Sequence, residues 1–246
     1  MPPLPTRCAV DIGQLRVACS SCSLRELCLP AGFKAREMEK IDSLVGQRRR
    51  VRKGEYLYRA GAPLAALYAL RSGFMKSCVL HEDGREQVAG FHMMGDLLGM
   101  DAIGGGHHMS DTMALEDSEV CEMPFTVLER LSREFPPLQL QLHRVMSREI
   151  VRDYGVMLLL GSMKAEERLA AFLLNLSQRF AARGYSPAEF NLRMTRQEIG
   201  SYLGLKLETV SRAFSSFHQH QLVEVRHRHV RILDPGGLKA VLGPAR

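Results

Sequence analysis

The sequence is poor in aromatic side chains and has no tryptophan among its 246 residues. Phe, Tyr and Trp together make up 7% of the chain, so we expect a core of Leu, Val, Ile, Met and Ala. No apolar run approaches the ~18 residues that span a bilayer, and the N-terminus lacks the basic and apolar regions of a secretory signal. Hydrophobic residues (46%) and charged residues (24%) are in globular proportions, which excludes a fibrous or largely disordered chain. The sequence predicts a cytoplasmic protein without a membrane partner.

The net charge of +6 is confined to the last third of the chain. Residues 1–163 contain 20 Lys+Arg and 20 Asp+Glu, whereas residues 164–246 contain 13 and 7. A basic excess restricted to one region is typical of a segment that binds a polyanion, most often nucleic acid. A solvated basic face without a partner is the alternative that charge alone leaves open.

Three of the six cysteines cluster near the N-terminus, in the segment ACSSCSLRELCLP that contains Cys19, Cys22 and Cys28. Cytoplasmic thiols stay reduced, which makes a disulfide framework the weaker interpretation. Small polar residues and a closing proline favour a loop that can wrap a metal centre.

A β-rich segment is expected from Arg48 to about Phe125, after a short helix within residues 33–45. Short alternating stretches at residues 56–58, 67–70, 75–80 and 87–91 are separated by glycines, and Asp83–Gly84 is a strong hairpin signal. About six to eight such strands at ~8–12-residue spacing predict a small barrel or roll. The glycines at 104–106 do not form a phosphate-binding loop, because no strand–helix context or Lys-Ser/Thr accompanies them.

From Pro137 onward the pattern is helical. A coiled-coil seam is predicted at alternating spacings of four and three residues. Its residues are Met146, Ile150, Asp153, Met157 and Leu160. In a dimer, this seam would bring two Asp153 carboxylates together across the axis. The alternative is that the seam packs on its own domain with Asp153 at its edge.

The last third contains a helix-turn-helix pattern. Thr195 and Glu198 form a capping box at the start of one helix, and Gly204 ends that helix. A second helix begins near Leu207 and turns Val210, Phe214 and Phe217 inward. Two apolar stretches around residues 226–229 then predict a β-hairpin wing with a basic tip.

The second helix of such a motif reads base edges in the major groove. Glu208, Ser211 and Arg212 share one face opposite the apolar residues, and their side chains suit base recognition. Basic residues nearby are expected to hold phosphates. The full predicted DNA-contacting set is Thr195, Arg196, Lys206, Glu208, Thr209, Ser211 and Arg212, with Arg226 and Arg228 on the wing. A helix pair used only for protein contact is the alternative.

These motifs resemble one known family. EIGSYLGL followed by LETVSRAF is similar to the recognition motif of the Crp/Fnr (catabolite-activator/Fnr) superfamily. CSSCSLRELC with a distant Cys121 resembles its oxygen-sensing Fnr/Anr branch, as do RSGFMKSCVLHEDGREQVAGFHMMGDLLGMDAIG, VCEMPF and AEERLAAFLLNLSQRFAARGYSP. The resemblance implies an α+β fold in four parts: a cluster-binding segment (1–29), a β-roll sensor like a cyclic-nucleotide-binding jelly roll (30–136), a dimerisation helix (137–163) and a winged helix-turn-helix (164–246).

The resemblance further implies a 4Fe–4S cluster bound by Cys19, Cys22, Cys28 and Cys121. Thiolates without paired histidines suit iron–sulfur clusters and zinc alike, although structural zinc sites with four cysteines typically use two close pairs. Spacing alone leaves both open, and the resemblance favours the cluster. Cys8 and Cys78 do not match ligand positions.

By the same resemblance, we expect a homodimer that forms without oxygen and loosens when oxygen converts the cluster. It would bind a palindrome similar to TTGAT followed four bases later by ATCAA. Loops that would touch RNA polymerase contain Ser72, Gly73, Asp83, Gly84, Arg183, Tyr185 and Ser186, whose alternative interpretation is ordinary exposed turns.

The sequence bears on three other functions. A Crp-like regulator with structural zinc or a small-molecule ligand remains the competing interpretation. Cyclic-nucleotide binding is not expected, since the stretch His107–Asp111 lacks the phosphate-gripping Arg of such members and adds a carboxylate. No catalytic constellation of the Ser-His-Asp or paired-carboxylate kind is recognised, so an enzyme is not expected.

Overall fold

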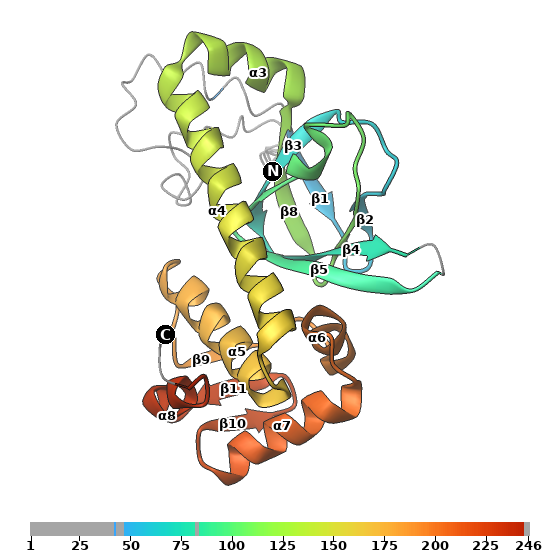
Figure 1. The fold of residues 1–246 in the computed structure, drawn as a ribbon. Helices are drawn as coiled ribbons and strands as arrows, with labels where there is room; N and C mark the ends of the chain where they lie inside the picture. The colour runs from blue at the N-terminus through green and yellow to red at the C-terminus, as the bar shows by residue number, and fades with distance from the viewer. Residues whose placement is uncertain (1–41, 43–46, 82–83, 244–246) are drawn as a thin grey trace, which may run out of the picture.

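The computed structural model describes residues 42, 47–81 and 84–243. Within them, the N-terminal half forms two four-stranded antiparallel sheets (Figure 1). The first sheet contains, in spatial order, β1 (Gln47–Val51), β8 (Ser118–Pro124), β3 (Ala66–Ser72) and β6 (Leu97–Leu98). The second contains β2 (Tyr56–Tyr58), β7 (Asp111–Ala114), β4 (Phe74–Leu80) and β5 (Glu86–Met93). The predicted roll and the α+β class are confirmed.

The interior of the roll is filled by side chains from both sheets. Strand residues alternate between two faces, so every second residue points inward. Val120, Leu70 and Met75 are among those with no exposed surface. Tyr58 stacks on His108 at 3.7 Å between ring centroids, and burial raises the pKa of its hydroxyl. The roll therefore has a solid aromatic and aliphatic core.

Strands β4 and β5 form the expected hairpin, with Phe74 opposite Met93 and Leu80 opposite Glu86. Gly84 near its tip adopts φ +83°, a conformation that favours glycine. Asp83 lies outside the described residues, as does the predicted helix at 33–45 apart from Asp42, which is helical.

Two helices follow the roll. α3 (Phe125–Glu134), which the sequence did not predict, starts directly after β8 and packs Leu128 and Leu131 on Leu67 of the first sheet. α4 (Pro136–Ser162) is the predicted long helix and begins with prolines in its first turn, where their missing N–H groups cost nothing. It runs along the roll from α3 to the C-terminal half (Figure 1).

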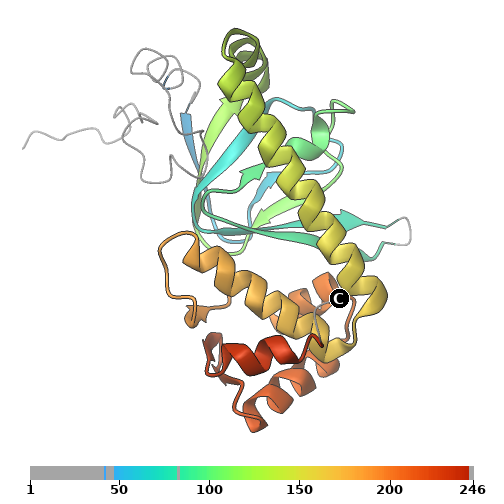
Figure 2. The same cartoon turned by 60° about the vertical axis from the view of Figure 1, so that its left-hand side comes forward.

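The C-terminal half forms a compact layer of helices on a small sheet. Its elements are α5 (Ala165–Ala181), β9 (Glu189–Asn191), α6 (Arg196–Leu203), α7 (Leu207–Gln219), β10 (Val223–Arg226), β11 (His229–Ile232) and α8 (Pro235–Ala240). β11 lies between β9 and β10, so the predicted wing is confirmed, with a tighter turn at residues 227–228 than expected. Figure 2 shows this half directly beneath the roll, at the end of α4. None of the described helices is long and apolar enough to cross a membrane.

Candidate nucleic-acid interface

Helix α6 begins with the predicted capping box. The hydroxyl Oγ1 of Thr195 accepts from the backbone N–H of Glu198 at 3.2 Å, and Oε2 of Glu198 accepts from the N–H of Thr195 at 2.7 Å. Two backbone donors that a helix start leaves unpaired are thereby satisfied. Gly204 ends α6 in the left-handed conformation, φ +63°, and allows the tight turn into α7.

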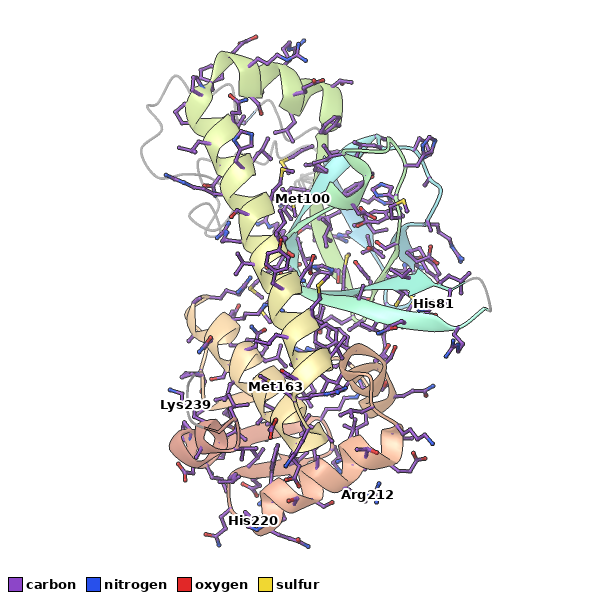
Figure 3. All side chains as sticks on the ribbon, in the orientation of Figure 1. His81, Met100, Met163, Arg212, His220 and Lys239 are labelled. Atoms are coloured by element: carbon purple, nitrogen blue, oxygen red, sulfur yellow. The ribbon has the colours of Figure 1, made fainter. Side chains whose placement is uncertain are left out.

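Helix α7 separates apolar and polar side chains as predicted. Val210, Phe214 and Phe217 are buried in the core of the C-terminal half. Glu208 and Arg212 are exposed, with Ser211 half-buried beside them. Figure 3 shows Arg212 on the outer side of α7, away from the rest of the molecule. The hydrogen-bonding groups that can read a base edge therefore face solvent.

The side chains predicted to contact phosphate differ in whether they already contact other residues of the protein. Lys206, just before α7, is exposed and pairs with none of the described residues. Arg196 is half-buried with its guanidinium 5.2 Å from the ring centroid of Phe214. On the wing, Arg226 pairs with Glu224 at 2.7 Å, whereas Arg228 donates to the carbonyl of Arg193 at 3.3 Å. Among the remaining members, Thr195 is exposed and Thr209 is half-buried.

Helix α6 also contacts the roll, which the sequence did not predict. The Nζ of Lys76 in β4 lies 3.1 Å from Oε1 of Glu198 and 3.3 Å from Oε1 of Glu86. Burial works to lower the pKa of Lys76, but these carboxylates and the neighbouring Cys78 outweigh it and raise the pKa. The backbone N–H of Val88 in β5 donates to the hydroxyl of Ser201 at 2.9 Å. The sequence signal for this contact is a lysine inside a mostly apolar strand.

Cys121 lies in β8, with Arg48 of β1 and Ala69 of β3 as cross-strand neighbours. The adjacent Val120 is fully buried in the roll interior, so strand alternation places Cys121 on the outer face, where it is partly exposed. A ligand that comes from outside the roll can reach this thiol.

Of the other five cysteines, only Cys78 lies within the described residues. The remaining predicted ligands and one further thiol lie outside the described residues: Cys19, Cys22, Cys28 and Cys8. Cys78 is buried in β4, and burial together with a hydrogen bond to Glu86 raises the pKa of its thiol to about 12. Such a thiol stays protonated and unreactive. Within the part of the chain that is described, no group of three or more His, Cys, Asp or Glu is placed to hold a metal ion.

The loop that follows β6 is organised by Asp101, a residue that sequence analysis did not single out. Oδ2 of Asp101 accepts from the backbone N–H of Met109 at 2.9 Å, and from both the N–H (3.1 Å) and the hydroxyl (3.0 Å) of Ser110. Nδ1 of His108 donates to Oδ1 at 3.2 Å. The carboxylate thus occupies the donors of the stretch in which cyclic-nucleotide-binding members hold phosphate.

The five predicted seam residues of α4 fall into two groups. Ile150, Asp153 and Met157 are exposed, whereas Met146 and Leu160 are half-buried and Leu160 packs against the core of the C-terminal half. Further exposed apolar side chains on α4 continue the uncovered row: Leu140, Val151, Tyr154 and Leu158. The seam itself stays a prediction, and the exposed apolar side chains of α4 extend beyond its five residues.

The residues assigned to polymerase contact are placed unequally. Ser72, Gly84, Tyr185 and Ser186 are exposed, and Asp83 lies outside the described residues. Gly73 has φ +93° and a Cβ there would collide with Ser118, so this position needs glycine for the turn itself. Arg183 is largely buried, with a guanidinium that pairs with Asp96 at 2.7 Å.

Comparison with known proteins covers nearly the whole chain. Residues 48–135 match the cyclic nucleotide-binding domain and residues 167–241 match the Crp-like helix-turn-helix domain. The transcriptional regulatory protein btr of Bordetella pertussis is 49% identical over 225 residues, which are 92% of this chain and 93% of that protein. The fumarate and nitrate reduction regulatory protein of Escherichia coli K12 is 45% identical over 237 residues, 96% and 95% of the two chains. FixK2 from Bradyrhizobium japonicum has a solved structure that matches with a TM-score of 0.75 at 30% identity, over 81% of this chain and 98% of that one.

Proposed function

The chain belongs to the Crp/Fnr family of transcription regulators, and from that premise we propose that it responds to oxygen through a 4Fe–4S cluster and binds DNA as a homodimer in the absence of oxygen. Its helix-turn-helix binds DNA, and its relatives are regulators rather than enzymes. The similarity to a protein named for fumarate and nitrate reduction supports the oxygen response. The proposed target is a palindrome resembling TTGAT-N4-ATCAA.

The observation that carries DNA reading is the polar row of α7. Arg212 presents two donors that match the O6 and N7 acceptors of guanine, and Glu208 accepts from the amino group of cytosine. Both are exposed while the opposite face of α7 is fully buried. Lys206 precedes the helix and neutralises phosphate without reading sequence.

Cys121 fits the fourth ligand of the cluster, with Cys19, Cys22 and Cys28 as the other three. It lies on the outer face of β8, opposite Arg48 of β1, where its partly exposed side chain can be reached from outside the roll. Four thiolates are the ordinary ligand set of such a cluster. When bound, the cluster supplies an oxygen-sensitive link between the N-terminal cysteines and the roll.

The uncovered apolar row on α4 supports dimerisation. A contiguous apolar surface on a long helix is stabilised when a second copy covers it. A two-fold arrangement along α4 would place two α7 helices in successive major grooves, one helical turn apart. RNA polymerase is the further partner, contacted through the exposed loops around Ser72, Gly84, Tyr185 and Ser186, with Arg183 and Gly73 supporting these loops from within.

Asp101 argues against a nucleotide ligand in this roll. The backbone and hydroxyl donors at positions 109 and 110 already bind a carboxylate, so an incoming phosphate would meet negative charge there. We therefore expect cyclic nucleotides to leave DNA binding unchanged.

The test is anaerobic purification of the full chain, followed by iron analysis and a visible spectrum. We expect a brown protein that bleaches in air, and Cys121→Ser should lose both iron and anaerobic DNA binding. Cys78→Ser is the matched control, because that buried thiol should be dispensable. A colourless protein that contains zinc would instead support the competing function, a Crp-like regulator with a structural metal or a small-molecule ligand.

A further inference from the structure

The turn between β5 and β6 carries a carboxylate that faces the C-terminal half. The side chain of Asp96 is 12% exposed, and its Oδ2 accepts from the backbone N–H of Met93 at 2.9 Å. The same oxygen accepts from Arg179, and Oδ1 accepts from Nη2 of Arg183 at 2.7 Å. Arg179 lies in the last turn of α5 and Arg183 in the turn that follows it, so the C-terminal end of α5 surrounds one carboxylate.

The two arginines also bind the backbone of the roll. Nη1 of Arg179 donates to the carbonyl of Phe91 at 3.0 Å, and Nε of Arg183 donates to the carbonyl of Met94. Burial alone would raise the pKa of Asp96, but the two guanidinium groups hold it below its ordinary value. The carboxylate therefore stays ionised, and each charged partner is hydrogen-bonded, which a buried ion pair requires to be stable.

The covalent connection between the two halves is short and extended. α4 ends at Ser162, and Met163 and Lys164 are extended before α5 begins. Arg168 binds the carbonyls of Leu160, Met163 and Leu203, which joins the end of α4 to α6. These bonds hold the connection together, but none of them reaches the roll.

Several further contacts join the roll and the C-terminal half, among them an ion pair between Glu116 and Arg193 at 3.0 Å. Phe91, Phe172 and Tyr202 form an aromatic cluster with centroids 5.2–6.0 Å apart. Val88 and Lys76 bind α6, as described above. Asp96 differs from these contacts because two charged residues of the C-terminal half, Arg179 and Arg183, bind it at once. This double contact restricts the relative orientation of the two halves most strongly.

We propose that Asp96 is a positioning residue that docks the winged helix-turn-helix on the roll and thereby fixes where α7 lies relative to the dimer helix α4. The docked arrangement leaves the polar row of α7 uncovered and is therefore compatible with DNA binding. Docking by itself does not depend on the identity of the signal. Its consequence for DNA rests on the proposed function, since half-site spacing is meaningful only for a DNA-binding dimer.

The first measurement is hydrogen exchange of the full chain, purified anaerobically, for Asp96→Asn and Arg179→Gln. The N–H of Val88 donates across the interface and so reports docking directly. We expect it to exchange about tenfold to a hundredfold faster in either variant, because one partner of a buried ion pair is lost. Amides of the β3–β8 pair should keep their wild-type rates. Equal acceleration in β3 and β8 would show a general loss of stability and would overturn the proposal.

The double variant and a surface control sharpen this result. If Asp96 and Arg179 act together, Asp96→Asn combined with Arg179→Gln should change the exchange rate by less than the product of the single effects. Arg133→Gln is the matched control, since Arg133 pairs with Glu129 in an exposed position on α3. Independent effects at the two sites would contradict a shared docking role.

The second measurement compares DNA binding to palindromes with four and six base pairs between half-sites. Two extra base pairs rotate one half-site around the duplex, so a rigidly docked dimer discriminates strongly between them. We expect Asp96→Asn to reduce this discrimination about tenfold, by weakening the native spacing more than the altered one. Equal weakening of both sites would refute positioning. A wild-type protein that binds neither would refute the proposed function, while the exchange of Val88 would still decide docking.

Discussion

Helices α4 and α7 are both amphipathic, but they leave opposite kinds of side chain uncovered. On α4, Tyr154 and Met157 are 64% and 65% exposed, next to other apolar residues. On α7, Val210, Phe214 and Phe217 are buried, whereas Glu208 and Arg212 face solvent. An apolar row is stabilised by any surface that excludes water, whereas a polar row needs a partner with matching donors and acceptors. The first suits a second copy of the chain, and the second suits base edges.

The largest effect is expected from a charge placed in the apolar row. Met157→Glu would bury two unpaired carboxylates in a two-fold contact, at a cost of several kcal/mol. We expect anaerobic sedimentation to show a monomer, and binding to the palindrome to fall more than about a hundredfold. Arg130→Glu, a charge change at an exposed position of α3, is the control and should leave the dimer intact. A dimeric Met157→Glu protein would remove α4 from the interface.

The next effect concerns the carboxylate within the same row. In a dimer, two Asp153 side chains at ~5 Å with an effective dielectric near 20 would repel by about 3 kcal/mol. Asp153→Ala should therefore give a dimer that persists in air and binds DNA without the cluster. Sedimentation of aerobic wild-type and variant protein measures this. If the variant is monomeric in air, Asp153 lies outside the switch.

On α7, the loss of one base contact should be smaller and specific. Arg212→Ala should cost about 1–3 kcal/mol and relax discrimination mainly at one guanine per half-site. Titrations with the palindrome, single-base variants of it and random DNA give both numbers. Equal weakening on specific and random DNA would show that Arg212 contacts the backbone instead.

The smallest effect is expected beside the helix. Lys206→Ala should weaken all DNA sequences alike and reduce the slope of log affinity against log salt by about one per protomer contact. Binding measured over a range of salt concentrations tests this. A change in base preference would show that Lys206 contacts base edges and not phosphate.

Local signals explain why the helix-turn-helix and the roll could be predicted. The capping box at Thr195 and Glu198 and the stop at Gly204 act within a few residues, and the structure shows each of them. Helix α3 was missed because it follows β8 without a side-chain cap, at Pro124. Leu160, a predicted seam residue of α4, also packs on the core of the C-terminal half, because a periodic pattern cannot tell which neighbour a side chain contacts.

Long-range partners explain what sequence reasoning could not find. Asp96 is separated from its arginines by more than 80 residues, and Lys76 is more than 100 residues from Glu198. Nothing in local spacing distinguishes such a carboxylate from a solvated one. The sequence placed Arg183 in a surface loop for the same reason. Its burial depends on contact with the roll, which is distant in sequence.

Asp101 has a consequence for how the roll responds to its surroundings. A loop ordered by a free anion is ordered only while that anion is abundant, because occupancy follows concentration. Asp101 is attached to its donors by seven to nine residues of chain, so its effective concentration is set by connectivity and does not vary with metabolism. The order of this loop therefore does not require a free anion. The roll thus provides a fixed structure, and the variable signal acts at another part of the molecule.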